Sequence, residues 1–236
     1  ADMGATATED VKFEWESETE NTVTIIPGKY QNASGLNAAG ASWSQGLFAS
    51  TFKKVDETKA VNVTAAEMLA LLSRKDGVKA GEVYRVSGAL NLASDTTYYG
   101  NFAAIIADGG VFIKNASNTS LRDIIIKGNV TITNSSDISL HQVEIRGGAV
   151  GLSIDSISSR VSVSGCAISA TNTAVDSAAA NVSLYRCRLV ANTGVRSTGS
   201  DMTVQDCIIK SEDVGIESSG NYFIARSNTI TVSNVS

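Results

Sequence analysis

The sequence of 236 residues contains one proline, one histidine, three cysteines and few aromatic residues, and each shortage narrows what the chain can be. No apolar run approaches the roughly 18 residues that a membrane-spanning helix needs, so we expect no membrane insertion. The single histidine, His141, excludes metal sites built from two histidines. Because Pro27 is the only proline, turns have to be made by Gly, Asn, Ser and Asp, which bond to their own backbone or tolerate left-handed geometry.

Positive charge is also scarce, since the net charge is -5. Residues 1–60 hold nine acidic and five basic residues, whereas residues 61–236 hold fifteen acidic and fourteen basic ones. No stripe of Lys and Arg runs along the chain, so we expect no nucleic acid as a partner. The sequence also has no Gly-rich phosphate-binding loop with its lysine.

Six segments share one spacing of apolar positions and follow one another at steps of 19 to 23 residues. In one of them, the apolar residues are Val182, Leu184, Cys187 and Leu189. Positions two apart place side chains on one face of a strand, and the jump of three between the pairs indicates a corner. The six segments begin at Thr119, Ile138, Val161, Val182, Met202 and Phe223.

Two or three short strands in a repeat of about 21 residues are typical of one coil of a parallel β-helix. Coils stack at about 4.8 Å, so equivalent positions form ladders. One inward ladder contains all three cysteines; its members are Ile124, Val143, Cys166, Cys187, Cys207 and Asn228. We expect buried, inert thiols, because in-register side chains are poorly aimed for a disulfide and an odd count leaves at least one thiol free.

A helix is predicted at residues 65–76, immediately before the repeats. Thr64 and Glu67 have the spacing of a capping box, while Lys75 and Gly77 suit the end of a helix. The first coil of a β-helix has an exposed apolar end and an unpaired edge. We therefore expect this helix to cap the N-terminal end of the coils.

Residues 1–60 are predicted to form a β-rich extension packed on the coils, or a small β module. Val11, Phe13 and Trp15 alternate with charged residues, which is the pattern of a strand with one side in water. Residues 61–236 form the second predicted unit, the parallel β-helix with its helix.

The predicted helix, the stretch GEVYRVSGALNLASDTTYYGN that follows it and the stretch ASNTSLRDIIIKG with its repeats resemble the right-handed parallel β-helix of the pectin-lyase-like superfamily. The resemblance covers about residues 62–236 and implies an all-β solenoid of about six to seven coils. This superfamily includes polysaccharide lyases and hydrolases, phage tailspikes and adhesins, so the resemblance alone does not select a function.

The function that we expect is that of a secreted or cell-surface module, which binds a polysaccharide or serves a structural role. The outward positions before the corner carry polar and aromatic side chains; they include Arg122, His141, Tyr185, Gln205 and Arg226. Tyr185 could stack on a sugar ring while the polar residues fix its hydroxyl groups.

A polysaccharide lyase or hydrolase acting on an acidic glycan is the first alternative. The densest polar cluster lies on two neighbouring repeats; it combines Arg122, Asp123 and Lys127 with His141, Glu144 and Arg146. An arginine could pair with a uronate carboxylate, and a basic side chain could take the adjacent proton. Calcium is expected only for a lyase, because the pectate lyases of this superfamily bind it through acidic residues on neighbouring coils. No such set of acidic residues recurs on consecutive repeats here, and for any other function we expect no cofactor and no metal.

The simpler interpretation of the cluster is a solvated face whose ion pairs are each weak.

A structural β-helix from a phage fibre or a bacterial envelope assembly is the second alternative. The sequence stops in a strand pattern, at ITVSNVS. Because an uncovered β-helix end tends to aggregate, we expect a further domain or another subunit at the open C-terminal coil.

Overall fold

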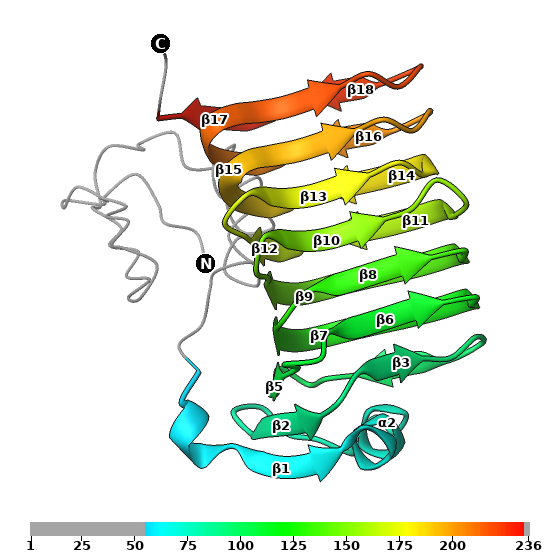
Figure 1. The fold of residues 1–236 in the computed structure, drawn as a ribbon, viewed down its shortest axis with the longest axis vertical. Helices are drawn as coiled ribbons and strands as arrows, with labels where there is room; N and C mark the ends of the chain where they lie inside the picture. Colours follow the sequence, from blue (N-terminus) through cyan, green and yellow to red (C-terminus); the bar gives the residue numbers. More distant parts are fainter. Residues whose placement is uncertain (1–54, 234–236) are drawn as a thin grey trace, which may run out of the picture.

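The computed structural model describes residues 55–233, which form a parallel β-solenoid (Figure 1). The 3-10 helix η1 (Glu57–Lys59), strand β1 (Val61–Thr64) and helix α2 (Ala65–Leu72) come first, and strands and turns make up the rest. The coils stack along the long axis, with β1 and α2 at one end and β17 to β19 at the other. Most of the predicted N-terminal extension lies outside the described residues.

Each complete coil has three sides, which we name A, B and C. Side A consists of β3 (Leu90–Leu92), β6 (Val111–Lys114), β8 (Val130–Thr133), β10 (Val150–Ile154), β13 (Thr173–Ser177) and the second halves of β15 (Arg188–Ser197) and β17 (Ile208–Ser218). Side B consists of β4 (Thr97–Tyr99), the first halves of β7 (Ser117–Lys127) and β9 (Ser136–Arg146), β11 (Ser159–Ser164), β14 (Ala180–Tyr185), β16 (Thr203–Gln205) and β18 (Ile224–Arg226). Side C consists of β1, β2 (Val83–Ser87), β5 (Ala104–Ile106), the second halves of β7 and β9, β12 (Ala167–Ser169), the first halves of β15 and β17, and β19 (Thr229–Val232).

The solenoid has about eight turns, against the six to seven expected. The additional turns lie before Thr119, where three residues, Gly100, Asn101 and Phe102, form the corner between Tyr99 of β4 and the buried Ala103 that precedes β5. Later coils use a single residue at this corner, so the longer corner breaks the spacing by which the repeats were recognised.

The jump of three in the apolar pattern is a corner made by one residue in left-handed conformation. These residues have φ angles between 51° and 61°; they are Asp123, Gln142, Gly165, Arg186, Asp206 and Ser227. A second left-handed residue lies at or just before the start of each of the later side B strands, and Asn or Asp often occupies it, as in Asn181 and Asp201. Asn and Asp tolerate this conformation better than most residues, which explains how a chain with one proline makes so many turns.

The interior consists of stacked apolar ladders. On side C, for example, Ile126, Ile145, Ile168, Leu189 and Ile209 occupy equivalent positions on successive coils, and all five are at most 1% exposed. Full burial of such a side chain stabilises the fold by about 1.5–3 kcal/mol. Since one coil cannot bury its own inner face, this core exists only through stacking.

The inward ladder of cysteines is confirmed, and all three thiols are buried and free. Cys166 Sγ accepts a hydrogen bond from the backbone N–H of Val143, with 3.4 Å between nitrogen and sulfur. On the last coil, Asn228 Oδ1 accepts from the N–H of Cys207 (2.9 Å) and its Nδ2 donates to the carbonyl of Val204 (2.9 Å). The ladder residue of one coil therefore satisfies backbone groups at the corner of the coil before it.

Hydrogen bonding between the stacked thiols also changes their acidity. A bond with Cys166, together with burial, raises the pKa of Cys187, while a bond with Cys187 and burial raise the pKa of Cys207. Because the thiolate is the reactive form, we expect both buried thiols to react slowly in the folded chain.

Helix α2 caps the N-terminal end of the coils, as predicted, but it ends at Leu72 rather than at residue 76. The capping box is present: Thr64 Oγ1 accepts from the N–H of Glu67 (3.2 Å), and Glu67 Oε2 accepts from the N–H of Thr64 (2.7 Å). Met68 and Leu72 are fully buried in the main core. The helix stops early because the chain folds back on it, so that a Cβ at Gly77 would lie 1.9 Å from the carbonyl oxygen of Leu71.

No helix within residues 55–233 is long and apolar enough to cross a membrane.

Candidate functional site

A row of polar and aromatic side chains follows the edge of side B, one residue before each corner. The strand register places its members opposite one another on seven consecutive coils, so they lie about 4.8 Å apart. We name this row the B-edge ladder; it consists of Tyr99, Arg122, His141, Ser164, Tyr185, Gln205 and Arg226. Five of the nine predicted site residues belong to it.

Hydrogen bonds between coils hold parts of the B-edge ladder in place. His141 Nδ1 and Ser164 Oγ bond at 2.9 Å. Arg226 Nε donates to Gln205 Oε1 (2.8 Å), and Gln205 Nε2 donates to Asp206 Oδ2 (3.1 Å). The side chains are therefore oriented along the stack and remain partly exposed.

Tyr185 is the exposed aromatic residue of the B-edge ladder, with 37% of its surface accessible. The guanidinium of Arg186 lies 4.8 Å from the centre of its ring. This cation–π contact covers one ring face and places a positive charge beside it. A sugar ring would have to stack on the opposite face.

A row of hydroxyl groups lies beside the B-edge ladder, two residues earlier in each strand. The register confirms the predicted row of Ser120, Ser139, Ser162, Ser183 and Thr203. The outer face of side B therefore carries a row of small hydroxyl groups beside a row of longer polar side chains, and both rows can make hydrogen bonds.

The other predicted site residues lie beyond the corner. Asp123 is itself the left-handed corner residue, with a φ of 54°. Lys127, Glu144 and Arg146 are on side C, where Arg146 Nε donates to Glu144 Oε1 at 2.7 Å and Lys127 pairs with Glu57. The six-residue cluster behind the lyase alternative is thus divided between two sides of the coil.

One member of the B-edge ladder was missed in the sequence. Tyr99 lies opposite Arg122, and the ammonium group of Lys75 lies 5.8 Å from its ring centre. The sequence signal was the alternation in TTYYGN, where Tyr98 is buried and Tyr99 is half-buried. It was overlooked because this strand precedes the six copies of the repeat.

No three side chains of His, Cys, Asp or Glu in the described part of the chain are grouped closely enough to hold a metal ion.

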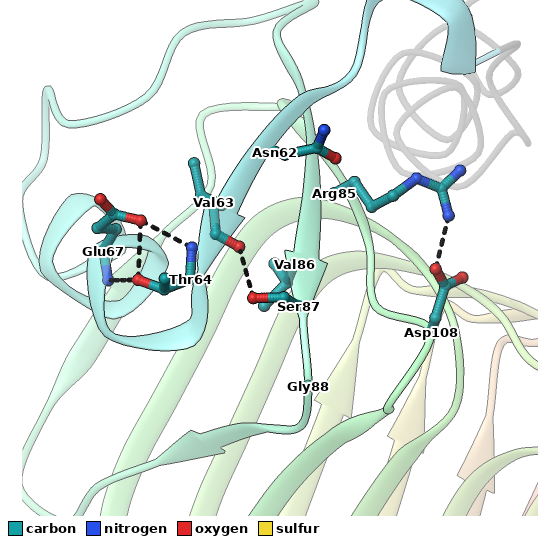
Figure 2. A pocket seen from close by; sticks show the side chains of 9 residues that line it. All are labelled: Asn62, Val63, Thr64, Glu67, Arg85, Val86, Ser87, Gly88 and Asp108. Atoms are coloured by element: carbon teal, nitrogen blue, oxygen red, sulfur yellow. Dashed lines mark hydrogen bonds and ion pairs between the residues drawn. The ribbon is translucent and has the colours of Figure 1, made fainter.

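A cavity of about 390 Å³ lies at the N-terminal end, next to β1 and β2 (Figure 2). Its polar groups bond to one another: Arg85 Nη1 pairs with Asp108 Oδ2 at 2.5 Å, and Ser87 Oγ donates to the carbonyl of Val63 at 3.4 Å. Bonds from the backbone N–H and hydroxyl of Thr64 lower the pKa of Glu67 and commit its carboxylate to the helix cap. These pairings give the cavity a structural role, so the B-edge ladder is the stronger candidate site.

The strand pairings alone establish the parallel β-solenoid. No protein-family model, curated protein or solved structure matches this chain.

Proposed function

We propose that this chain is a secreted or cell-surface β-helix module of the pectin-lyase-like superfamily, and that it binds a polysaccharide along the outer face of side B. The observation that carries the proposal is the B-edge ladder, which runs in register over seven coils. Six steps of about 4.8 Å give a row of about 29 Å. A row of this length suits a linear polymer, whereas a small molecule is normally enclosed in a pocket.

The side chains of the ladder match the chemistry of a sugar chain. Tyr99 and Tyr185 offer rings for stacking, and Gln205 offers an amide that can donate and accept hydrogen bonds. Arg122 and Arg226 can pair with the carboxylate groups of an acidic sugar. An acidic polysaccharide is therefore the preferred ligand class.

The place of action that we propose is outside the cell, on a bacterial envelope or a phage particle, where such polymers are encountered. This part of the proposal depends on the nature of the ligand and on the resemblance to the superfamily.

The test is a glycan-array screen of the full chain, with an ultraviolet assay for new unsaturated uronate ends on every glycan that binds. We expect binding without new ends. For a bound glycan, Tyr185→Ala should weaken binding about tenfold, which corresponds to the roughly 1.4 kcal/mol of one aromatic contact. The matched control is Tyr222→Asn, which removes an exposed tyrosine outside the ladder.

Three outcomes would contradict this assignment. Binding that Tyr185→Ala and Tyr222→Asn change equally would remove the ladder from the site. New unsaturated ends would favour the lyase alternative, with calcium as its cofactor. Silence on an array rich in acidic glycans would favour the structural role.

A structural role has one observation in its favour. On the last described coil, an interior side chain has no following coil to cover it. Ile230 occupies the interior position opposite Ile209, yet it is 44% exposed. An open apolar end with unpaired strand edges can stack on a further domain or subunit. Concentration-dependent association of the full chain, weakened by Ile230→Glu, would support this second candidate.

A further inference from the structure

Both tyrosines of the B-edge ladder, Tyr99 and Tyr185, have a cation beside the ring. The ammonium group of Lys75 lies 5.8 Å from the ring centre of Tyr99, and the guanidinium of Arg186 lies 4.8 Å from that of Tyr185. Both distances are within the roughly 6 Å at which a cation is attracted to the face of an aromatic ring. We name each tyrosine with its cation a ring-and-cation unit.

The two units are built in different ways. Arg186 is the left-handed corner residue that directly follows Tyr185, and it is the only basic residue among the single-residue corners described above. Lys75 reaches Tyr99 from the turn that follows helix α2. This turn is held by Asn101, in the longer corner of the early coils, because Asn101 Nδ2 donates to the backbone carbonyl of Lys75. Two unrelated local structures therefore produce the same arrangement, which the repeat alone does not supply.

The units lie on one ladder, four coils apart. The strand register places Tyr99 opposite Arg122 and continues through His141 and Ser164 to Tyr185. Four steps of about 4.8 Å separate the units by about 19 Å. The paired strands of the coils between them fix this distance before a ligand binds, and a preformed site loses less free energy in ordering itself.

The outer face of side B gives access to both units. Tyr185 and the two cations are exposed, and Tyr99 is half-buried. Side C differs at the same end of the solenoid, because Val55 and Ala60 pack there on an apolar cluster outside the core; the cluster consists of Val83, Ala104, Ile106 and Ile125. A polymer that runs along side B can reach both units without displacing this packing.

Each unit matches one acidic sugar. The open face of the tyrosine ring can stack on the sugar ring, and the cation beside it can pair with a carboxylate or sulfate group. A short oligomer can occupy one unit at a time, whereas a longer chain can occupy both. Once the first unit is filled, binding at the second is intramolecular, and linkage of this kind raises affinity by about a hundredfold to ten-thousandfold.

We propose that the two ring-and-cation units are anchor subsites for a single chain of an acidic polysaccharide, which binds tightly only when it is long enough to reach both. This inference rests on the proposed function. It adds that the ligand has to span about 19 Å along the solenoid axis, and that Tyr99 and Lys75 take part in selecting it.

The first test is calorimetry of the full chain with size-defined oligomers of mannuronate, galacturonate and hyaluronan. A disaccharide is shorter than the distance between the units, and a decasaccharide is longer. For the polymer that binds best, we expect the decasaccharide to bind at least about a hundredfold more tightly than the disaccharide. Similar affinities for the two lengths would overturn this inference alone. Absence of binding at every length would overturn the proposed function with it.

The second test removes the parts of one unit. Tyr99→Ala should weaken binding of the decasaccharide about tenfold, as Tyr185→Ala does, because one aromatic contact is lost. It should change binding of the disaccharide less than about threefold, since the other unit remains. An equal effect on both lengths would contradict the inference.

Lys75→Gln tests the same unit at an exposed position, where a failure to fold is not expected. It should weaken binding of the decasaccharide and make that binding less sensitive to salt. The matched control is Lys114→Gln, which removes the same charge from an exposed position on side A. Equal effects of the two substitutions would exclude Lys75 from the subsite and overturn the inference.

Discussion

Strand β7 passes through two sides of one coil, and its outward residues have opposite fates. Arg122, on side B, is exposed, whereas Ile125, three residues later and beyond the corner, is 6% exposed. Both point away from the interior, so the difference is caused by what lies outside the coil. The comparison teaches that the outer surface of a β-helix is not uniform: side B carries polar groups in water, while side C buries a second apolar cluster.

The largest effect is expected when two truncated side chains on strand β7 are compared. Ile125→Ala should lower the free energy of unfolding by about 3 kcal/mol, because it removes buried atoms and leaves a cavity. Ser120→Ala, on the side B half of β7, should change it by less than about 0.5 kcal/mol. Urea unfolding of both variants gives the two values. Equal, small losses would mean that side C is not covered at Ile125 in solution.

The corner that separates the two sides gives the next largest effect. Asn228→Ala removes both hydrogen bonds that Asn228 makes with the preceding coil, and should cost about 1–2 kcal/mol. Asn228→Cys should lose less than half of this, since cysteine performs the same task at Cys166 and Cys187. Chemical denaturation of the pair measures the difference. If the cysteine variant is as unstable as the alanine variant, the thiols act only as apolar filling.

A smaller effect, dependent on pH, is expected at the turn that leads into side B at β11. Burial opposes ionisation of Asp155, but hydrogen bonds from Ser158 and from the backbone N–H of Asn134 outweigh it and lower its pKa. The stabilisation is present above the unfolded pKa of about 3.9 and is lost as the pH falls through the lower, folded pKa. Unfolding free energies at pH 6 and pH 3 should therefore differ less in Asp155→Ala than in the wild type, by on the order of 1 kcal/mol.

The control for this prediction is Asp213→Asn, which replaces an exposed carboxylate on β17. It should retain the pH dependence of the wild type. If Asp155→Ala and the wild type lose the same stability in acid, Asp155 does not hold the turn through its charge.

The smallest expected effect concerns the ion pairs of Glu57 with Arg85 and Lys127. These side chains are 38–50% exposed, so Glu57→Gln should cost less than about 1 kcal/mol, and less still in 0.5 M salt. Thermal unfolding at two salt concentrations measures it. A loss above 2 kcal/mol would mean that charge, rather than the apolar cluster under Val55, holds the chain to side C.

The sequence permitted prediction of the interior far better than of the outer surface. Positions such as Leu184, Cys187 and Leu189 recur because each coil buries the same small set of side chains, and a left-handed residue accounts for the jump between Leu184 and Cys187. The longer corner at Gly100 hid the first coils, and the fold-back at Gly77 shortened the helix. Both features depend on contacts between residues that are distant in sequence, and a local pattern of apolar residues does not reveal such contacts.

The candidate site was predicted in part for the same reason. Positions of the B-edge ladder follow from the repeat, so Arg122 and Tyr185 were found, but Lys127 and Glu144 were grouped with them because they are close in sequence. The apolar residue at Ile125 was the available signal that side C is covered, since an isoleucine is rarely placed in water at the centre of a polar face.

The most direct test of the account is hydroxyl-radical footprinting of the unmodified full chain, with oxidation rates measured residue by residue. The chain supplies its own standards: Ile157 is 70% exposed and Ile126 is 1% exposed. The account predicts that Ile125, on the outer face of side C, is oxidised as slowly as Ile126, while Tyr185, on side B, is oxidised rapidly. Oxidation of Ile125 at the rate of Ile157 would contradict the central claim that the chain covers side C at Ile125 and leaves side B open.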